Sequence, residues 1–192
     1  MLEFNFEPFP ILETKRMTLR KLGKGDIAEI FILRKDPAII KYIDRTPPNE
    51  VKEIENFLIQ TATDTASNVG ITWGIELKGK DKIIGYLSFW RTMPVNHRAE
   101  IGYALMKEYW QMGLMTEAID AILHYGFNVM KLHSVEANIN PLNIASMKIL
   151  KKFQFVQEAH FKEDYYFEGN FLDSVIFSLL ARNYSPVLER KE

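Results

Sequence analysis

A change in the spacing of apolar residues near position 71 constrains the fold of this 192-residue chain more than any other feature. In the segment before it apolar residues recur at helical spacing. From it they alternate with polar residues over three consecutive runs, residues 71–78, 82–91 and 98–105. Alternation at a period of two is typical of β-strands, and Gly79-Lys80-Asp81 between the first two runs is a short hairpin signal. The centre of the chain therefore predicts three strands, the first two joined as an antiparallel hairpin.

The segments on either side of these strands add helices and a second hairpin. The expected elements are, in chain order, a strand over 16–22, helices over 26–35, 37–43 and 51–63, the three central strands, a helix over 116–130, a strand over 133–137, a helix that begins at Asn140-Pro141, and strands over 155–167 and 171–181. Asp26, Asn49 and Asn140 are the expected N-caps of three helices. The order β-α-α-α-β-β-β-α-β-α-β-β predicts an α/β (α+β) fold, with one mixed, mostly antiparallel seven-stranded sheet flanked by helices.

Composition excludes several classes of protein. The 24 Lys and Arg residues balance 25 Asp and Glu residues, so there is no basic field to hold nucleic acid or a membrane surface. Cysteine is absent and the four histidines form no pair at ligand spacing, so neither a thiol nucleophile nor a metal site is expected. Residues 1–10 do not resemble a signal peptide, and no apolar run approaches the ~20 residues of a membrane span. We expect a single cytoplasmic domain over 1–192, with peripheral ends at 1–10 and 185–192.

The most informative stretch is Tyr109-Trp110-Gln111-Met112-Gly113-Leu114-Met115-Thr116-Glu117-Ala118, which lies between an expected strand and an expected helix. A loop of this kind aims free backbone N–H groups and the positive end of a helix at one point. Gly113 lets an anion approach the backbone closely, so the expected ligand is a phosphate or pyrophosphate. The alternative is that Gly113 only eases the turn. Neither the Gly-Lys-Ser/Thr of a Walker loop nor a three-glycine dinucleotide motif is present.

This loop resembles the acyl-CoA pyrophosphate loop of the GNAT N-acetyltransferases, and it is most similar to their ribosomal-protein (Rim-type) branch. Three further segments resemble the family in the same order: Leu12-Glu13-Thr14-Lys15-Arg16-Met17-Thr18-Leu19-Arg20 with Asp26, Ala99-Glu100-Ile101-Gly102-Tyr103, and Asn140-Pro141-Leu142-Asn143-Ile144-Ala145-Ser146 with Leu150-Lys151-Lys152-Phe153-Gln154-Phe155. The resemblance covers about residues 11–182. Met115 departs from the small residue that the family prefers, Trp110 from the Gln or Arg of the wider family, and Gln154 from the usual glycine.

The resemblance implies acetyl-CoA as co-substrate and no metal. In the family the strand before the loop splays from the next strand, and the pantetheine arm lies between them. The implied coenzyme-binding residues are Tyr103, Ala104, Leu105, Gln111, Met112, Gly113, Leu114, Met115, Thr116, Asn138 and Asn143.

Transfer of an acyl group from a thioester to an amine requires a base for the amine and an acid for the leaving thiolate. Glu100 is the expected base, because alternation places it on the strand face opposite to Ile101 and Tyr103. The alternative is an ordinary glutamate that is exposed or paired with Arg98.

Two residues are candidates for the acid. Ser146 follows Asn143 by three positions, on the same helix face, and in the family that face meets the thiol of the coenzyme. Ser146 is therefore the expected proton donor and Asn143 a coenzyme-orienting amide, although Asn143 could instead only cap its helix. Tyr166 ranks second, because a late-strand tyrosine often has this role in the wider family and at most one of Tyr165 and Tyr166 can face the site.

The expected function is transfer of an acetyl group to a primary amine, and the branch resemblance favours a protein N-terminal amine as the acceptor. The expected state is a monomer or homodimer. One alternative is a small-amine acetyltransferase, for which Asp44, Glu50 and Glu53 near the first helices are weak support. Another is a non-catalytic acyl-CoA-binding module. Residues 43–49 and 91–97 would shape the acceptor site, but they match no motif that identifies the acceptor.

Overall fold

The three alternating runs become adjacent antiparallel strands in the computed structural model, which describes residues 2–187. They are β3 (Ile71–Leu77), β4 (Ile83–Met93) and β5 (Arg98–Leu105). The other strands are β1 (Leu12–Glu13), β2 (Met17–Lys21), β6 (Ser134–Ile139), β7 (Val156–Phe167) and β8 (Asn170–Leu180).

All of these strands belong to one mixed sheet in the order β1-β2-β3-β4-β5-β6-β8-β7. Every neighbouring pair is antiparallel except β5 and β6, which run parallel. The predicted mixed, mostly antiparallel sheet is confirmed, but it has eight strands rather than seven. The additional strand is the two-residue β1, which is too short to show alternation in the sequence.

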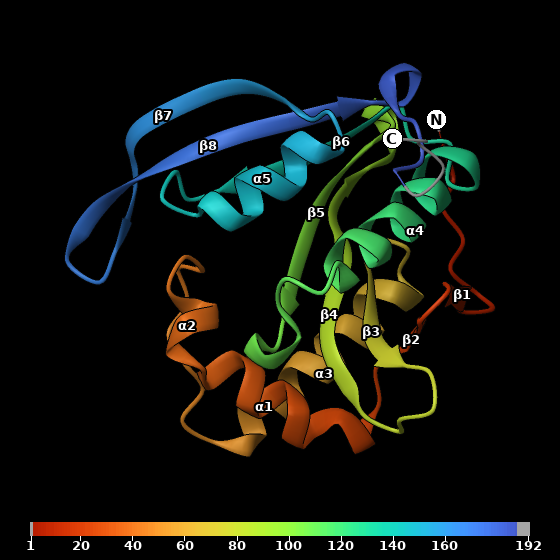
Figure 1. The fold of residues 1–192 in the computed structure, drawn as a ribbon, viewed down its shortest axis with the longest axis vertical. Helices are drawn as coiled ribbons and strands as arrows, with labels where there is room; N and C mark the ends of the chain where they lie inside the picture. The colour runs from red at the N-terminus through yellow and green to blue at the C-terminus, as the bar shows by residue number, and fades with distance from the viewer. Residues whose placement is uncertain (1, 188–192) are drawn as a thin grey trace.

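Helices cover both faces of the sheet (Figure 1). The helices are α1 (Ile27–Lys35), α2 (Pro37–Ile40), α3 (Val51–Ala66), α4 (Leu114–Asn128) and α5 (Ile144–Lys152), with short 3₁₀ turns at Lys24–Asp26, Pro94–Asn96, Lys107–Tyr109 and Ala181–Asn183. The main core joins α4 and α5 to one face, and a smaller cluster of Ile30, Ile54 and Ile83 joins α1 and α3 to the other. Among residues 2–187, no helix has both the length and the apolar stretch that crossing a bilayer requires.

The N-terminal segment, expected at the periphery of the domain, is anchored on the core by its phenylalanines. Phe6 is fully buried and Phe4 is nearly so, and burial of each ring contributes about 1.5–3 kcal/mol. The indole Nε1 of Trp73 also donates to the carbonyl of Pro10 at 2.7 Å. Of the expected C-terminal peripheral segment, only residues 185–187 lie within the described part of the chain.

Two expected N-caps are displaced along the sequence. Helix α3 has Glu50 rather than Asn49 as its N-cap, and Glu53 Oε1 accepts from the backbone N–H groups of both residues. Helix α5 begins after Asn143 rather than Asn140. The side chain of Asn140 accepts from the N–H of Leu142 and so forms a turn, which leaves Asn143 Oδ1 to accept from Ser146 N–H at 3.0 Å.

The expected hairpin around Glu168-Gly169-Asn170 is confirmed as the tip of β7 and β8. The hairpin extends well beyond the rest of the sheet, and β7 forms the last strand (Figure 1). A bulge interrupts its pairing between Phe161 and Tyr165, where Glu163 has a φ of 52°.

Candidate active site

The parallel pair β5 and β6 separates partway along its length. The two strands pair at only three positions, the last of which joins Glu100 to Glu136. Beyond that point β5 continues to Leu105 beside β4, while β6 continues to Ile139 beside β8 (Figure 1). The sheet therefore opens at Glu100, and the strand end that contains Tyr103, Ala104 and Leu105 borders the opening. The carbonyl of Leu105 already accepts from the Trp110 indole at 2.7 Å.

The turn that follows β5 presents a helix start without a capping side chain. Helix α4 begins at Leu114, two residues before the expected Thr116, with Gly113 as its N-cap at φ 73°. Leu114 and Met115 are buried, and no side chain bonds to the first backbone amides of the helix. Because a helix start leaves its first amides without helical partners, this turn suits an anion.

Gly113 leaves open space at this turn. Its left-handed φ is one that residues with a Cβ adopt at a cost of roughly 1–2 kcal/mol. A Cβ at this position would have only Arg16 Nη2 near it, at 3.5 Å, so the absent side chain leaves open space beside a guanidinium. Gln111 and Met112, on the same turn, are exposed.

Glu100 is a buried carboxylate at the point where the strands separate. It is 4% exposed, and it accepts a hydrogen bond from the backbone N–H of Asn138 on β6. Burial raises its pKa to about 7, and the nearby Glu136 adds to that rise, while Arg91 and the Asn138 amide oppose it. A carboxylate with a pKa near neutrality is suited to accept a proton. Asn138, expected at the coenzyme, thus already donates its amide to Glu100, and its side chain is exposed.

The cation beside Glu100 is Arg91 rather than Arg98. Arg91 Nη1 lies 3.4 Å from Glu100 Oε2, and its guanidinium stacks on Trp90, 4.4 Å from the ring centroid. Arg98 instead pairs with Glu136. Sequence reasoning included Arg91 only in the segment 91–97 expected to shape the acceptor site, and it missed the pairing with Glu100, which depends on the β4–β5 register that sets Trp90 opposite Glu100.

On the opposite face of β5, Tyr103 reaches the first turn of α5. Its Oη lies 2.5 Å from Ser146 Oγ, and Ser146 is only 7% exposed. Burial raises the pKa of Tyr103 to about 12, an effect that the bond to Ser146 partly opposes. The structure thus bonds Ser146 to the hydroxyl of Tyr103, a residue that the sequence analysis expected to bind the coenzyme only through its backbone. Asn143 caps the same helix turn, as its alternative interpretation held.

Tyr166, the second acid candidate, is not brought to this cluster. Its side chain is 64% exposed and packs edge to face against Phe171 near the hairpin tip. Its neighbour Tyr165 is the residue of the pair that turns inward, and it donates to Asp44 in the loop after α2. Burial and this carboxylate both raise the pKa of Tyr165.

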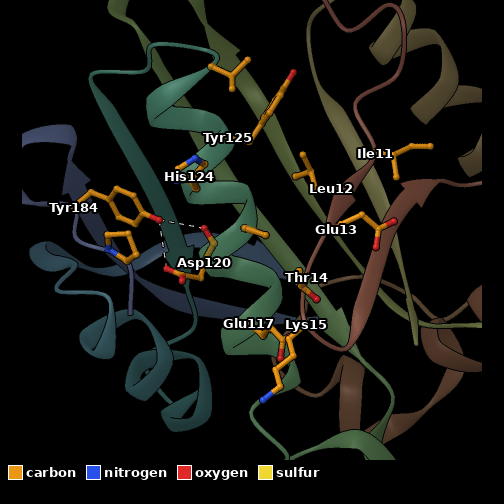
Figure 2. A pocket seen from close by; sticks show the side chains of 13 residues that line it. Ile11, Leu12, Glu13, Thr14, Lys15, Glu117, Asp120, His124, Tyr125 and Tyr184 are labelled. Atoms are coloured by element: carbon orange, nitrogen blue, oxygen red, sulfur yellow. Dashed lines mark hydrogen bonds between the residues drawn. The ribbon is translucent and has the colours of Figure 1, made fainter. Parts of the chain in front are cut away.

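A pocket of about 380 Å³ lies elsewhere, between the N-terminal segment, the outer side of α4 and the chain after β8 (Figure 2). Tyr184 donates to Asp120 across one part of it. Glu117 and Thr14 lie at its lower end in the view of Figure 2, close to the start of α4. It lacks Glu100, Tyr103 and Ser146, so it is separate from the candidate active site.

The protein is an acetyl-CoA-dependent acyltransferase, as its family match and its N-acetyltransferase relatives show, and a sheet that opens beside an uncapped helix start is consistent with that class. The family follows from the sequence itself. A profile for the acetyltransferase (GNAT) domain matches residues 16–156, so the chain belongs to the GNAT family of N-acetyltransferases. The uncharacterized N-acetyltransferase p20 of Bacillus licheniformis is 33% identical over 175 residues, covering 91% of this chain and 98% of that protein.

Solved structures share the fold at lower identity. RimL, a ribosomal L7/L12 alpha-N-protein acetyltransferase in complex with coenzyme A, aligns with a TM-score of 0.80 at 20% identity, covering 89% of this chain and 98% of that one. Spermidine N-acetyltransferase from Vibrio cholerae, in complex with CoA and spermine, aligns with a TM-score of 0.77 at 22% identity, covering 90% and 98%. The neighbours therefore act on more than one kind of amine.

Proposed function

We propose that the protein transfers the acetyl group of acetyl-CoA to the N-terminal amine of a protein. The observation that carries this choice of acceptor is the cation at the base: Arg91, whose side chain is 62% exposed, lies beside Glu100. A polyamine carries several positive charges, and one of them would meet this like charge on the way to Glu100. A protein N-terminus needs to bring only one amine.

The acids that favoured a small cationic acceptor have other roles. Glu53 accepts from two backbone amides at the start of α3, and Glu50 forms the N-cap of the same helix. Asp44 accepts from Tyr165. The similarity to RimL, which acetylates a ribosomal protein, supports the protein acceptor, whereas the similarity to the spermidine enzyme is the reason to test polyamines directly.

The residues divide the reaction between the two faces of β5. Acetyl-CoA supplies an activated acetyl thioester, and the amides of residues 111–116 with the strand end at Tyr103, Ala104 and Leu105 would hold it. Glu100 accepts the proton that the attacking amine loses. Ser146 donates a proton to the departing sulfur, and Tyr103, bonded to Ser146, can replace that proton.

The acceptor can be identified by following thiol release from acetyl-CoA with matched substrates. One peptide carries a free N-terminal amine, and its partner has a blocked N-terminus but a free lysine. Spermidine and an amino sugar complete the series. We expect the free N-terminus to give the highest kcat/KM. A higher kcat/KM for spermidine would show that the protein is a small-amine acetyltransferase instead. If the protein binds coenzyme but releases no thiol with any amine, it is a non-catalytic acyl-CoA-binding module.

The acid can be tested by removing each hydroxyl in turn. We expect Ser146→Ala to lower kcat by roughly ten- to a hundredfold, at or below the low end of the ~10²–10⁴-fold that acid–base catalysis typically contributes, because a coenzyme thiol leaves fairly well unassisted. The KM for acetyl-CoA should stay nearly constant. Tyr103→Phe should give a smaller loss, and Tyr166→Phe should have wild-type kinetics.

These outcomes separate the possible donors at saturating substrates. A loss confined to KM would show that Ser146 binds coenzyme without donating a proton. A severe loss in Tyr166→Phe with normal turnover in Ser146→Ala would move the donor to the late strand. Equal losses in Ser146→Ala and Tyr103→Phe would indicate that the two hydroxyls act as one unit.

A further inference from the structure

Arg16, just before β2, reaches the first turn of α4, where Glu117 lies 101 residues later in the chain. Its backbone N–H donates to Glu117 Oε1 at 2.8 Å, and its side-chain Nε donates to Glu117 Oε2 at 2.7 Å. The side chain of Glu117 is 4% exposed and that of Arg16 is 43% exposed. A buried carboxylate therefore fixes one edge of a guanidinium whose other edge lies at the surface.

The second edge of the guanidinium fixes the turn itself. Arg16 Nη1 donates to the carbonyl oxygen of Met112 at 2.9 Å. Because a peptide unit is planar, with its C=O and N–H pointing opposite ways, this bond also sets the direction of the Gly113 N–H, away from Arg16. The backbone here needs such a constraint, since Gln111 and Gly113 both have left-handed φ values, 61° and 73°.

Arg16 also offsets a charge that would oppose an anion at this turn. Glu117 lies in the first turn of α4, near the expected phosphate position. Burial alone would raise its pKa, but its bonds with Thr14 and with the backbone and side chain of Arg16 lower the pKa overall, so Glu117 stays ionised. Figure 2 shows Glu117 and Thr14 close together at the start of α4. The paired guanidinium neutralises this carboxylate, and its Nη2 lies beside the open space at Gly113.

We propose that Arg16 is a positioning residue of the coenzyme site, which holds the turn of residues 111–113 in the shape that binds the pyrophosphate of acetyl-CoA. The inference rests on the proposed position of the coenzyme. It predicts that the fork of the guanidinium matters more than its charge, because two directed donors are needed at Glu117 and Met112, and a lysine ammonium cannot supply both in one plane.

The test compares the affinity of two ligands by isothermal titration calorimetry. Coenzyme A contains the pyrophosphate and a phosphorylated adenosine, whereas pantetheine is the thiol arm without either. We expect Arg16→Gln to weaken coenzyme A binding by roughly ten- to a hundredfold, because hydrogen bonds to a charged group contribute a free energy of that size. Pantetheine binding should not change. Arg16→Lys should lose nearly as much. Lys15→Gln is the matched control: it removes the same charge from an exposed neighbour, so it should change neither affinity more than about twofold.

The two ligands distinguish failure of this inference from failure of the assignment beneath it. If the wild-type protein binds pantetheine as tightly as coenzyme A, the pyrophosphate is not held at this turn. If it prefers coenzyme A and Arg16→Gln keeps that preference, Arg16 has no role in positioning. Retained affinity in Arg16→Lys would also overturn the proposal, because charge alone would then suffice. The Arg16→Lys comparison remains decisive if thermal unfolding shows that Arg16→Gln is not folded.

Discussion

Replacing Glu100 with glutamine is expected to lower kcat by roughly 10²–10⁴-fold, the usual loss when a general base is removed. The amide keeps the size of the carboxylate, so the affinity for acetyl-CoA should change little. Steady-state kinetics with both substrates varied will separate the two effects. Wild-type turnover across neutral pH would assign Glu100 a purely structural role.

The pH dependence supplies a second signature of Glu100. Because its pKa is about 7, the base is mostly protonated below neutrality, and the wild-type kcat/KM should rise with pH through that value. In Glu100→Gln the part of this rise centred near pH 7 should vanish, and only the rise that follows deprotonation of the amine should remain, so the loss should shrink at high pH. A rise centred near pH 7 that persists in the variant would belong to another group.

Stability should respond in the opposite direction to activity. The pKa of Glu100 is higher in the folded protein than its ordinary value of 4.5, so the folded state holds a proton that the unfolded chain releases. Its contribution to stability is therefore lost as pH rises from about 4.5 to about 7. Glutamine carries no such penalty, and we expect Glu100→Gln to unfold at a temperature no lower than the wild type at pH ~8. A clear drop in its melting temperature there would show that the pairing with Arg91 outweighs the cost of burial.

Replacing Gly113 with aspartate is expected to abolish measurable coenzyme binding. The new carboxylate would fill the open space beside Arg16 and would repel the phosphates. Each effect costs of order 1–3 kcal/mol, so together they weaken binding by several kcal/mol. Calorimetric titration with coenzyme A measures this loss directly, and unchanged affinity in a folded variant would contradict the position assigned to the pyrophosphate.

Gly113→Asn is the matched control for this prediction. Asparagine has nearly the shape of aspartate and also tolerates a left-handed φ, but it carries no charge. The difference between the two variants therefore isolates like-charge repulsion, which should shrink as salt is added. Gly113→Ala reports the backbone strain alone, as a fall in melting temperature.

The fold was predictable wherever local signals agree with tertiary packing. Alternation located β3, β4 and β5 within two residues at every end, because strands with one buried face must alternate. The start of α5 was wrong because Asn140-Pro141 and Asn143 are both good local starts, and the side-chain bond of Asn140 to Leu142 decided between them. Helix α4 began early because Gly113, rather than a polar side chain, forms its cap.

The candidate site was predictable only in part, since its side chains meet across long sequence separations. Alternation correctly separated Glu100 from Tyr103, but periodicity carries no information about which residue of α5 meets the Tyr103 hydroxyl. The contact between Arg16 and Glu117 joins two segments that each resemble a family motif, but neither motif shows that the two segments pack together. Tyr165 and Tyr166 were distinguished by the position of the loop after α2, which places Asp44 beside one of them.

The extended hairpin also affects whether molecules of this protein can associate through the edge of the sheet. Strand β7 ends the sheet and exposes most of its twelve residues, so its outer edge could template the addition of strands from other chains. Two features oppose this: the bulge at the left-handed Glu163, which breaks the straight edge, and the charges of Glu158, Lys162 and Asp164. The bulge that interrupts the pairing of β7 with β8 therefore also makes the outer edge of this strand a poorer template for another chain.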